Sequence, residues 1–249
     1  MMSGHSKWSK VKHQKEASDA SKGKLFTKLA NAIIIAVKQG GGITDLQSNF
    51  RLRLAIDKAK SFNMPKDSIE RAVKRAVDKN TTDQLQEIVY EAFGPAGVGI
   101  IIEANTSNRQ RTVAELKNIL DRGGGALAET GAVSYLFKYV GVIQILKDNY
   151  AFDQIMEAAL NYQAVDLEDI GDKVEIYTLP SDLHRIKELL EKDGFKIISF
   201  ELFYRPTTTI PVTDRVTAVK VLELLTILEE MEDVKSVHAN VDIPDEYLK

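Results

Sequence analysis

Cysteine is absent from the 249-residue sequence, and long apolar runs are scarce. Without cysteine the chain has no disulfide framework, no thiolate metal site and no cysteine nucleophile, which fits a reducing compartment. The longest apolar run, Ala32 to Val37, lies inside an amphipathic pattern and is far below the roughly 20 residues that cross a bilayer. The N-terminus also lacks a signal-peptide apolar region, so we expect a cytoplasmic protein without a membrane partner.

Recognisable catalytic and cofactor-binding motifs are lacking as well. The triple glycines at 40–42 and 123–125 match neither a P-loop nor the G-x-G-x-x-G pattern, and they are typical of helix caps. The four histidines show no metal-ligand spacing, and no Gly-x-Ser-x-Gly elbow or spaced Ser/His/Asp set is present. We therefore expect a protein that is not an enzyme and needs no cofactor. The alternative is an enzyme with an unmarked carboxylate site in an interdomain cleft, with Glu129 as candidate, although a cap or turn role for Glu129 is the simpler interpretation.

Negative charge is scarce in the first third of the chain, although the whole chain has a net charge of −3. Residues 1–80 contain 17 Lys or Arg and 7 Asp or Glu, whereas residues 81–249 contain 16 basic and 29 acidic residues. A basic module is thus carried on an acidic body. This split predicts that only the module favours a polyanion.

The basic module opens with an arm in which lysines surround the only tryptophan. From Ser3 to Lys28 there are seven lysines and two acids. Lysines neutralise phosphates and a flat ring stacks on a base, so the arm indicates contact with DNA or RNA. The alternative is a solvated basic tail without a ligand, although such tails seldom contain tryptophan. The candidate contact residues of the arm are Lys7, Trp8, Lys10, Lys12, His13, Lys15, Lys22, Lys24 and Lys28.

The rest of residues 1–80 shows the apolar spacing of three short amphipathic helices that share one core. The first ends at Gly40, the second covers Phe50 to about Phe62, and the third follows Pro65. On the third helix Arg71, Lys74 and Arg75 share one side. They form either a phosphate-contacting face or an ordinary solvated face, and the two interpretations are nearly balanced. With Arg51 and Arg53 of the second helix they complete the candidate contact set.

After residue 80 the apolar pattern changes to that of strands and helices. Strands at 88–93 and 98–104 are joined by a Gly-Pro-Ala-Gly turn, and a helix that stops at the glycines 123–125 follows. Ser107 and Gln110 resemble a capping box for this helix. Arg109 and Arg111 in its first turn suit either an anion or neighbouring carboxylates, and the structural role is favoured. The last strand of this part is indicated by the alternation of Val133, Tyr135, Phe137 and Tyr139.

Residues 142–204 follow a β-α-β-β-α-β order, which is the ferredoxin-like signature. Its elements are strand 142–147, helix 151–162, strand 164–170, strand 174–179, helix 182–193 and strand 196–204. An RNA-recognition motif is not supported, because no RNP1 run exists and Tyr177 is the only aromatic residue on the third strand. After this unit the chain resumes a strand (207–212), a long helix (214–232) and a strand (234–242).

The predicted fold class is α+β and multidomain. An N-terminal three-helix domain is followed by two α/β layer domains, of which the ferredoxin-like one is inserted in the other. The predicted limits are 1–80 for the basic arm and helical domain, 81–140 plus 205–249 for the discontinuous α/β domain, and 141–204 for the inserted domain.

Long and specific motifs recur in order along essentially the whole chain. They are Gly4-His5-Ser6-Lys7-Trp8, Lys12-His13, Lys22-Gly23-Lys24, Phe26-Thr27-Lys28, Arg51-Leu52-Arg53-Leu54-Ala55-Ile56-Asp57-Lys58-Ala59, Asn63-Met64-Pro65-Lys66-Asp67, Ile69-Glu70-Arg71-Ala72, Asn108-Arg109, Arg111-Thr112-Val113-Ala114-Glu115, Glu129-Thr130-Gly131 and Val133-Ser134. Together they resemble the YebC/PmpR family. Phe50 and Tyr135 stand where that family usually has Pro and Trp, which affects local packing rather than class.

The resemblance implies the same three-domain build. It also implies one of two functions, because family members are described both as DNA-binding transcriptional regulators and as ribosome-associated translation factors. A mitochondrial member is a translational activator of cytochrome c oxidase. We therefore expect a non-enzymatic, nucleic-acid-binding regulator of gene expression. Its expected partners are DNA, ribosomal RNA or messenger RNA, and the ribosome itself. The lack of a helix-turn-helix pattern weakens base-specific reading of DNA.

Overall fold

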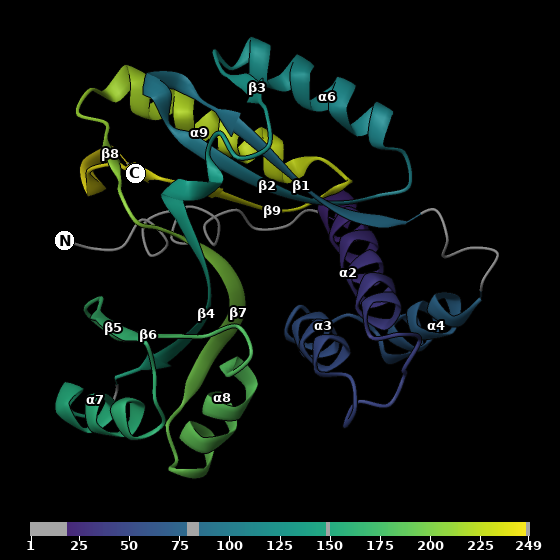
Figure 1. Ribbon diagram of the computed structural model, residues 1–249, viewed down its shortest axis with the longest axis vertical. Coiled ribbons are helices and arrows are strands. Elements are labelled where there is room, and N and C mark those ends of the chain that lie inside the picture. Colours follow the sequence, from purple (N-terminus) through teal and green to yellow (C-terminus); the bar gives the residue numbers. More distant parts are fainter. Residues whose placement is uncertain (1–18, 79–84, 148–149, 248–249) are drawn as a thin grey trace.

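The computed structural model describes residues 19–78, 85–147 and 150–247 (Figure 1). It has three parts: a helical unit and two units in which helices cover one face of a four-stranded sheet. The predicted α+β, multidomain fold class is confirmed. Within the residues described, no helix combines the length and the apolar character that crossing a membrane requires.

The helical unit consists of α2 (Asp19–Gln39), α3 (Phe50–Ser61) and α4 (Lys66–Val77). Helix α2 stops where Gly41 and Gly42 take positive φ angles of 69° and 83°, which glycine adopts without a Cβ clash. Helix α3 begins at Asn49, whose side-chain oxygen accepts a hydrogen bond from the backbone N–H of Leu52 at 3.0 Å. One apolar stripe from each helix meets in a shared core made by Leu29, Ile33, Val37, Leu52, Ile56, Ile69 and Ala72, among others.

The first sheet has the strand order β3-β1-β2-β9, and every neighbouring pair is antiparallel. Its strands are β1 (Gln86–Phe93), β2 (Gly99–Thr106), β3 (Ala126–Ala128) and β9 (Val234–Ala239). Helices α6 (Arg109–Arg122) and α9 (Arg215–Glu230) cover one face of this sheet (Figure 1). The opposite face is turned toward α2 and the second sheet, and it carries the polar groups described below.

Several short elements complete the first unit. The turn between β1 and β2 contains the 3-10 helix η1 (Pro95–Gly97), and another 3-10 helix, η3, covers Asp245–Tyr247. Strands β8 (Ile210–Pro211) and β10 (Val241–Asp242) form a small parallel pair. The strand predicted over 207–212 is therefore shorter than expected. The strand predicted over 234–242 is interrupted at Asn240.

The second sheet has the strand order β5-β6-β4-β7 and is antiparallel throughout. In chain order its elements are β4 (Phe137–Leu146), α7 (Phe152–Asn161), β5 (Asp166–Asp169), β6 (Lys173–Thr178), α8 (Leu183–Lys192) and β7 (Ile197–Pro206). Both helices lie on the face turned away from the first unit (Figure 1). This order and topology confirm the predicted ferredoxin-like unit, inserted between β3 and β9 of the first sheet. The exact domain limits given above remain a proposal, and β4 and β7 each cross one of them.

Two local predictions are wrong. Residues Ser134–Leu136 form the 3-10 helix η2 rather than part of a strand, and Tyr135 is 72% exposed. The physical reason is the buried Glu91 carboxylate, which accepts hydrogen bonds from three backbone N–H groups of residues 131–134 at 2.6–2.8 Å and so bends the chain. The other error is the cap of α6. Asn108, rather than Ser107, caps that helix by accepting a hydrogen bond from the Arg111 N–H at 3.1 Å.

Candidate nucleic-acid interface

The basic arm was predicted to contribute nine contact residues. Six of them, Lys7, Trp8, Lys10, Lys12, His13 and Lys15, lie outside the residues that the structure describes. Lys22 and Lys24 are exposed near the start of α2. Lys28 lies further along α2, and its ammonium group donates to the backbone carbonyl of Glu229 at the C-terminal end of α9. A cation is favourable at that end of a helix, so Lys28 joins the helical unit to the first sheet unit.

Helix α4 presents a basic surface to solvent. Ile69, Ala72 and Ala76 are buried, and the predicted contact residues Arg71, Lys74 and Arg75 are exposed. The Arg71 guanidinium donates to the Ser68 hydroxyl at 2.9 Å, within the same helix. Among the residues described, Lys74 and Arg75 have no carboxylate partner. The charge of this surface is thus available to an external anion.

Arg51 and Arg53 lie two residues apart on α3 but differ in their contacts. Arg53 donates to the backbone carbonyls of Leu46 and Gln47 at 2.9 and 3.2 Å, and it also contacts His184 and Glu188 of α8. Its donors therefore already have partners within the protein, and it links the helical unit to the inserted unit. Arg51 is exposed, and its guanidinium donates to the neutral Gln39 side chain.

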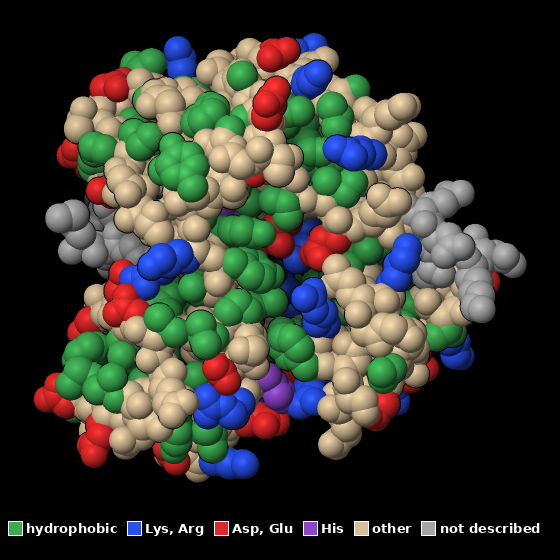
Figure 2. All heavy atoms as spheres, in the orientation of Figure 1, with side chains coloured by type: hydrophobic (Ala, Val, Ile, Leu, Met, Phe, Trp, Pro, Cys, Tyr) green, Lys and Arg blue, Asp and Glu red, His purple; other side chains and the backbone are tan. Residues whose placement is uncertain are grey.

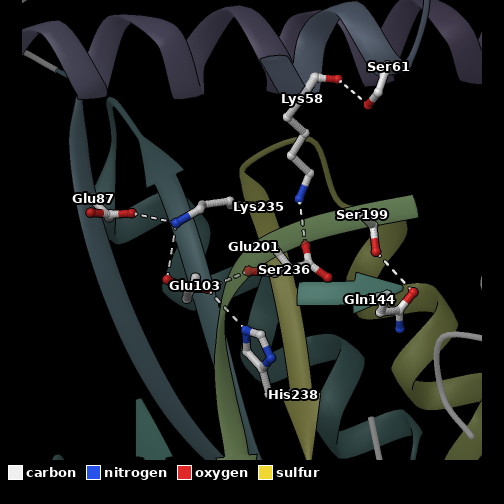
Figure 3. A network of polar contacts seen from close by, with 10 residues as sticks. All are labelled: Lys58, Ser61, Glu87, Glu103, Gln144, Ser199, Glu201, Lys235, Ser236 and His238. Carbon is white, nitrogen blue, oxygen red and sulfur yellow. Dashed lines mark hydrogen bonds and ion pairs between the residues drawn. The ribbon is translucent and has the colours of Figure 1, made fainter. Parts of the chain in front are cut away.

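The face of the first sheet that looks toward the other two units carries a connected polar network (Figure 3). Lys235 binds Glu87 at 2.8 Å and Glu103 at 3.1 Å. Glu103 also accepts from the Ser236 hydroxyl at 2.6 Å and lies 3.0 Å from His238 Nε2. Glu87 continues the network to Gln39 of α2 at 2.6 Å, and Gln39 in turn contacts Arg51.

The charges in this network hold one another in the ionised state. Burial opposes ionisation of Glu103, but the hydrogen bond from His238, the charge of Lys235 and the Ser236 hydroxyl outweigh it and lower the pKa of Glu103. Burial likewise opposes the charged form of Lys235, yet the carboxylates of Glu103 and Glu87 raise the pKa of Lys235. A general acid needs a carboxyl pKa raised toward neutrality, so this arrangement is typical of a structural network instead.

A β-bulge explains why adjacent residues of β9 contribute to the same network. Side chains normally alternate between the two faces of a strand. Here Glu103 pairs with Ser236, whereas the next residue, Ala104, pairs with Val234, so Lys235 is the extra residue of the strand. A bulge of this kind changes the direction of a side chain. Lys235 and Ser236 therefore both reach Glu103.

A cavity of about 130 Å³ lies where the three units meet. Its walls come from α2, α3, β4 and β7, and its floor is the polar face of the first sheet. The lining is largely apolar, and its cations are Arg51, Lys58 and Lys235. Figure 2 shows hydrophobic, basic and acidic side chains gathered around a hollow near the centre of the molecular surface in this view.

Two buried polar groups on the cavity lining lack a hydrogen-bond partner in the part of the chain that the structure describes. Asn105 is 4% exposed and its Oδ1 atom is unpaired. His238 uses Nε2 toward Glu103, and its Nδ1 atom is unpaired. Buried polar atoms are normally hydrogen-bonded, so unpaired ones call for an explanation.

Apart from Arg51, the prediction from sequence missed the residues of this network and cavity. Their signal was the polar residues Glu87, Glu103 and Lys235 within otherwise apolar strands, which places charge on a face that a sheet buries. Two other expected residues have structural surroundings. Glu129 is exposed in a turn, where its backbone carbonyl accepts from the Ala132 N–H at 3.1 Å. Arg111 pairs with Asp233 at 2.9 Å, in agreement with the structural role favoured above.

Comparison with known proteins finds matches along nearly the whole chain. Residues 6–79 match the family described as the TACO1/YebC protein N-terminal domain, and residues 85–241 match the TACO1/YebC second and third domain. A probable transcriptional regulatory protein of Sulfurihydrogenibium sp. is 45% identical over 249 residues, covering 100% of this chain and 98% of that protein. One from Acidithiobacillus ferrooxidans is 46% identical over 245 residues, covering 98% and 96% of the two chains.

A solved structure has the same fold. The crystal structure of a conserved hypothetical protein from Aquifex aeolicus superposes with a TM-score of 0.85 at 39% sequence identity. The match covers 96% of this chain and 98% of that one. The similarity therefore extends over all three units and their arrangement.

Proposed function

This chain belongs to the TACO1/YebC family, and we propose that it is a non-enzymatic regulator of gene expression that binds DNA or RNA through its basic arm and helical unit. A regulatory role is what the names of its relatives support. The observation that carries nucleic-acid binding is the exposed basic surface of α4, together with the excess of lysine in the N-terminal part of the sequence.

The proposed contacts go mainly to the nucleic-acid backbone. The cations of residues 1–80 are mostly lysines, which bind phosphate as point charges without the planar fork of arginine. Base-specific reading of the major groove relies on bidentate side chains such as Arg, Asn and Gln. We therefore expect weak discrimination between DNA sequences, well below the roughly 10³-fold that specific repressors show. Because family members are described as regulators of both transcription and translation, we also propose salt-sensitive association with ribosomes.

The α4 surface allows a matched test of this proposal. The triple variant Arg71→Gln, Lys74→Gln and Arg75→Gln removes three exposed cations from α4. The control variant Lys117→Gln, Arg122→Gln and Lys220→Gln removes three exposed cations from α6 and α9. Binding to a labelled RNA hairpin and a DNA duplex is followed by fluorescence anisotropy between 50 and 200 mM salt, roughly the range over which phosphate contacts weaken strongly.

The α4 variant should bind more weakly and with a smaller salt slope, by about one unit for each lost phosphate contact. The control should bind like the unmodified protein, because its charges lie on the acidic body. Equal effects of the two variants would show that binding depends on overall charge and would overturn the assignment to the helical unit. A sucrose-gradient profile of cell extract, at low and high salt, tests the ribosome association.

A further inference from the structure

The cavity at the junction of the three units has the composition of a ligand site. Its apolar walls include Leu54 of α3 and the ring of Phe200 of β7, and Tyr139 of β4 adds a second ring. Ligand pockets combine such walls with a few polar groups that fix orientation. The volume of about 130 Å³ is close to the roughly 150 Å³ of an apolar cavity that binds benzene. The cavity is therefore large enough for a small organic group.

The floor of the cavity includes a buried carboxamide whose acceptor atom lacks a partner among the residues described. Asn105 lies on β2 directly opposite Glu87 of β1 and is buried, with its Oδ1 atom unpaired among the residues described. A carboxamide presents an acceptor and a donor side by side. This edge is complementary to a heterocycle whose N–H or amino group stands next to a ring nitrogen or carbonyl, as in the nucleobases.

The rim of the cavity offers a place for an anion. Lys235 is already neutralised by Glu87 and Glu103, and Lys58 is paired with Glu201 at 3.0 Å. Arg51 is different, because its guanidinium donates to the uncharged Gln39 side chain. Its guanidinium therefore keeps an unbalanced positive charge at the mouth of the cavity. Lys58 is close to half exposed, so its ion pair is weak enough to rearrange toward a stronger anion.

From these three features we propose that the junction cavity binds a single nucleotide, with the base against Asn105 and the phosphate at Arg51 and Lys58. The rings of Tyr139 and Phe200 supply stacking surface for the base. The nucleotide comes either from solution or from a strand held by the basic surface. Only the second source rests on the proposed function. Since the cavity is built from all three units, a bound nucleotide would join them.

Isothermal titration calorimetry of the full chain with AMP and with ribose 5-phosphate tests the base site. AMP should bind at least about tenfold more tightly, because ribose 5-phosphate cannot stack or bond to Asn105. Asn105→Leu should reduce AMP binding to the level of ribose 5-phosphate. It should leave the melting temperature unchanged or higher, since it removes an unpaired buried acceptor. Ala55→Leu, which fills the cavity from α3, provides a second variant with the same expected loss.

The phosphate site is tested by a pair of arginine variants. Arg51→Gln should weaken AMP binding roughly tenfold, and Arg122→Gln on the distant helix α6 should not change it. Equal AMP binding by the unmodified protein, Asn105→Leu and Ala55→Leu would overturn the proposal. So would the absence of AMP binding together with equal binding of intact and abasic strands, which would leave the cavity as a water-filled structural feature.

The source of the nucleotide is identified with single-stranded 12-mers that are intact or carry one abasic position. If the strand supplies the base, the intact oligonucleotide binds more tightly and Asn105→Leu abolishes the difference. If a free nucleotide is the ligand, AMP binds but the abasic position has no effect. Either result supports the cavity site. AMP binding without any strand binding would refute the proposed function while leaving the nucleotide site intact.

Discussion

The turn at residues 131–134 is held by one buried carboxylate, and replacing it should open the turn. Glu91 accepts hydrogen bonds from the N–H groups of Gly131 at 2.7 Å, Val133 at 2.6 Å and Ser134 at 2.8 Å. Glu91→Gln preserves shape but leaves one acceptor oxygen and turns an amino group toward backbone donors. One or two hydrogen bonds to a charged group are lost, each worth about 1.5–3 kcal/mol.

The free energy of opening of this turn should therefore fall by about 3 kcal/mol, which corresponds to roughly 100-fold faster amide hydrogen exchange. The measurement is native-state exchange of the amides of residues 131–134 by NMR or mass spectrometry, compared with amides of β6 in the inserted unit as an internal reference. Glu129→Gln is the matched control, because Glu129 lies in the same turn but is exposed. Its exchange rates should equal those of the unmodified protein.

The same carboxylate predicts a pH dependence. Burial opposes ionisation of Glu91, but the three backbone hydrogen bonds outweigh it and lower its pKa. A lowered folded-state pKa gives stability that is present above the unfolded pKa, about 4.3, and is lost as the pH falls through the folded value. After correction for intrinsic exchange, opening of the turn should therefore increase in acid in the unmodified protein and in Glu129→Gln, but not in Glu91→Gln. Unchanged exchange in Glu91→Gln, or an equal effect of Glu129→Gln, would refute this account of the turn.

Three further predictions concern other parts of the molecule. Lys235→Met removes the hydrogen bonds from Lys235 to the carboxylates of Glu87 and Glu103, and it should destabilise the fold by about 2 kcal/mol, measured as a lower melting temperature. An unchanged melting temperature would contradict the network in Figure 3. Arg53→Gln should lower the melting temperature and change nucleic-acid affinity little, whereas Arg51→Gln should lower the affinity and change the melting temperature little, because of the two only Arg53 contacts α8. Thermal melting and fluorescence anisotropy measure the two effects, and equal effects of the two variants on both would contradict this distinction. Trp8→Ala should weaken nucleic-acid binding by about 1–3 kcal/mol with little change in melting temperature; a large drop in melting temperature with unchanged binding would indicate a core role instead.

Elements with strong local signals were predictable from the sequence. The three N-terminal helices could be predicted, because their apolar spacing, the glycines after α2 and Pro65 before α4 all act within a few residues. The ferredoxin-like order was predictable for the same reason, since the spacing of apolar residues alternates clearly between that of a strand and that of a helix. The resemblance to a known family came from motifs that the comparisons then matched along nearly the whole chain.

Features that depend on contacts between distant residues were not predictable in this way. The alternation around Val133 and Tyr135 indicated a strand, but a carboxylate 40 residues earlier in the chain bends that segment into η2. The bulge at Lys235 arises from the pairing of β9 with β2, and the sequence of β9 alone does not predict it. The cavity brings together α2, α3, β4 and β7 with the floor of the first sheet, so its residues share no local pattern.

The two long strands that lead into and out of the inserted unit have a consequence for how the protein is made. Phe137 at the start of β4 pairs with Pro206 at the end of β7, so the inserted unit is a continuous stretch of chain whose ends meet. In the first sheet, by contrast, Ile100 of β2 pairs with Ala239 of β9, and β9 follows the inserted unit in the sequence. During synthesis from the N-terminus we expect the inserted unit to fold while β1 and β2 still present an open edge. Completion of the first sheet, and with it the floor of the junction cavity, then follows the folding of the inserted unit.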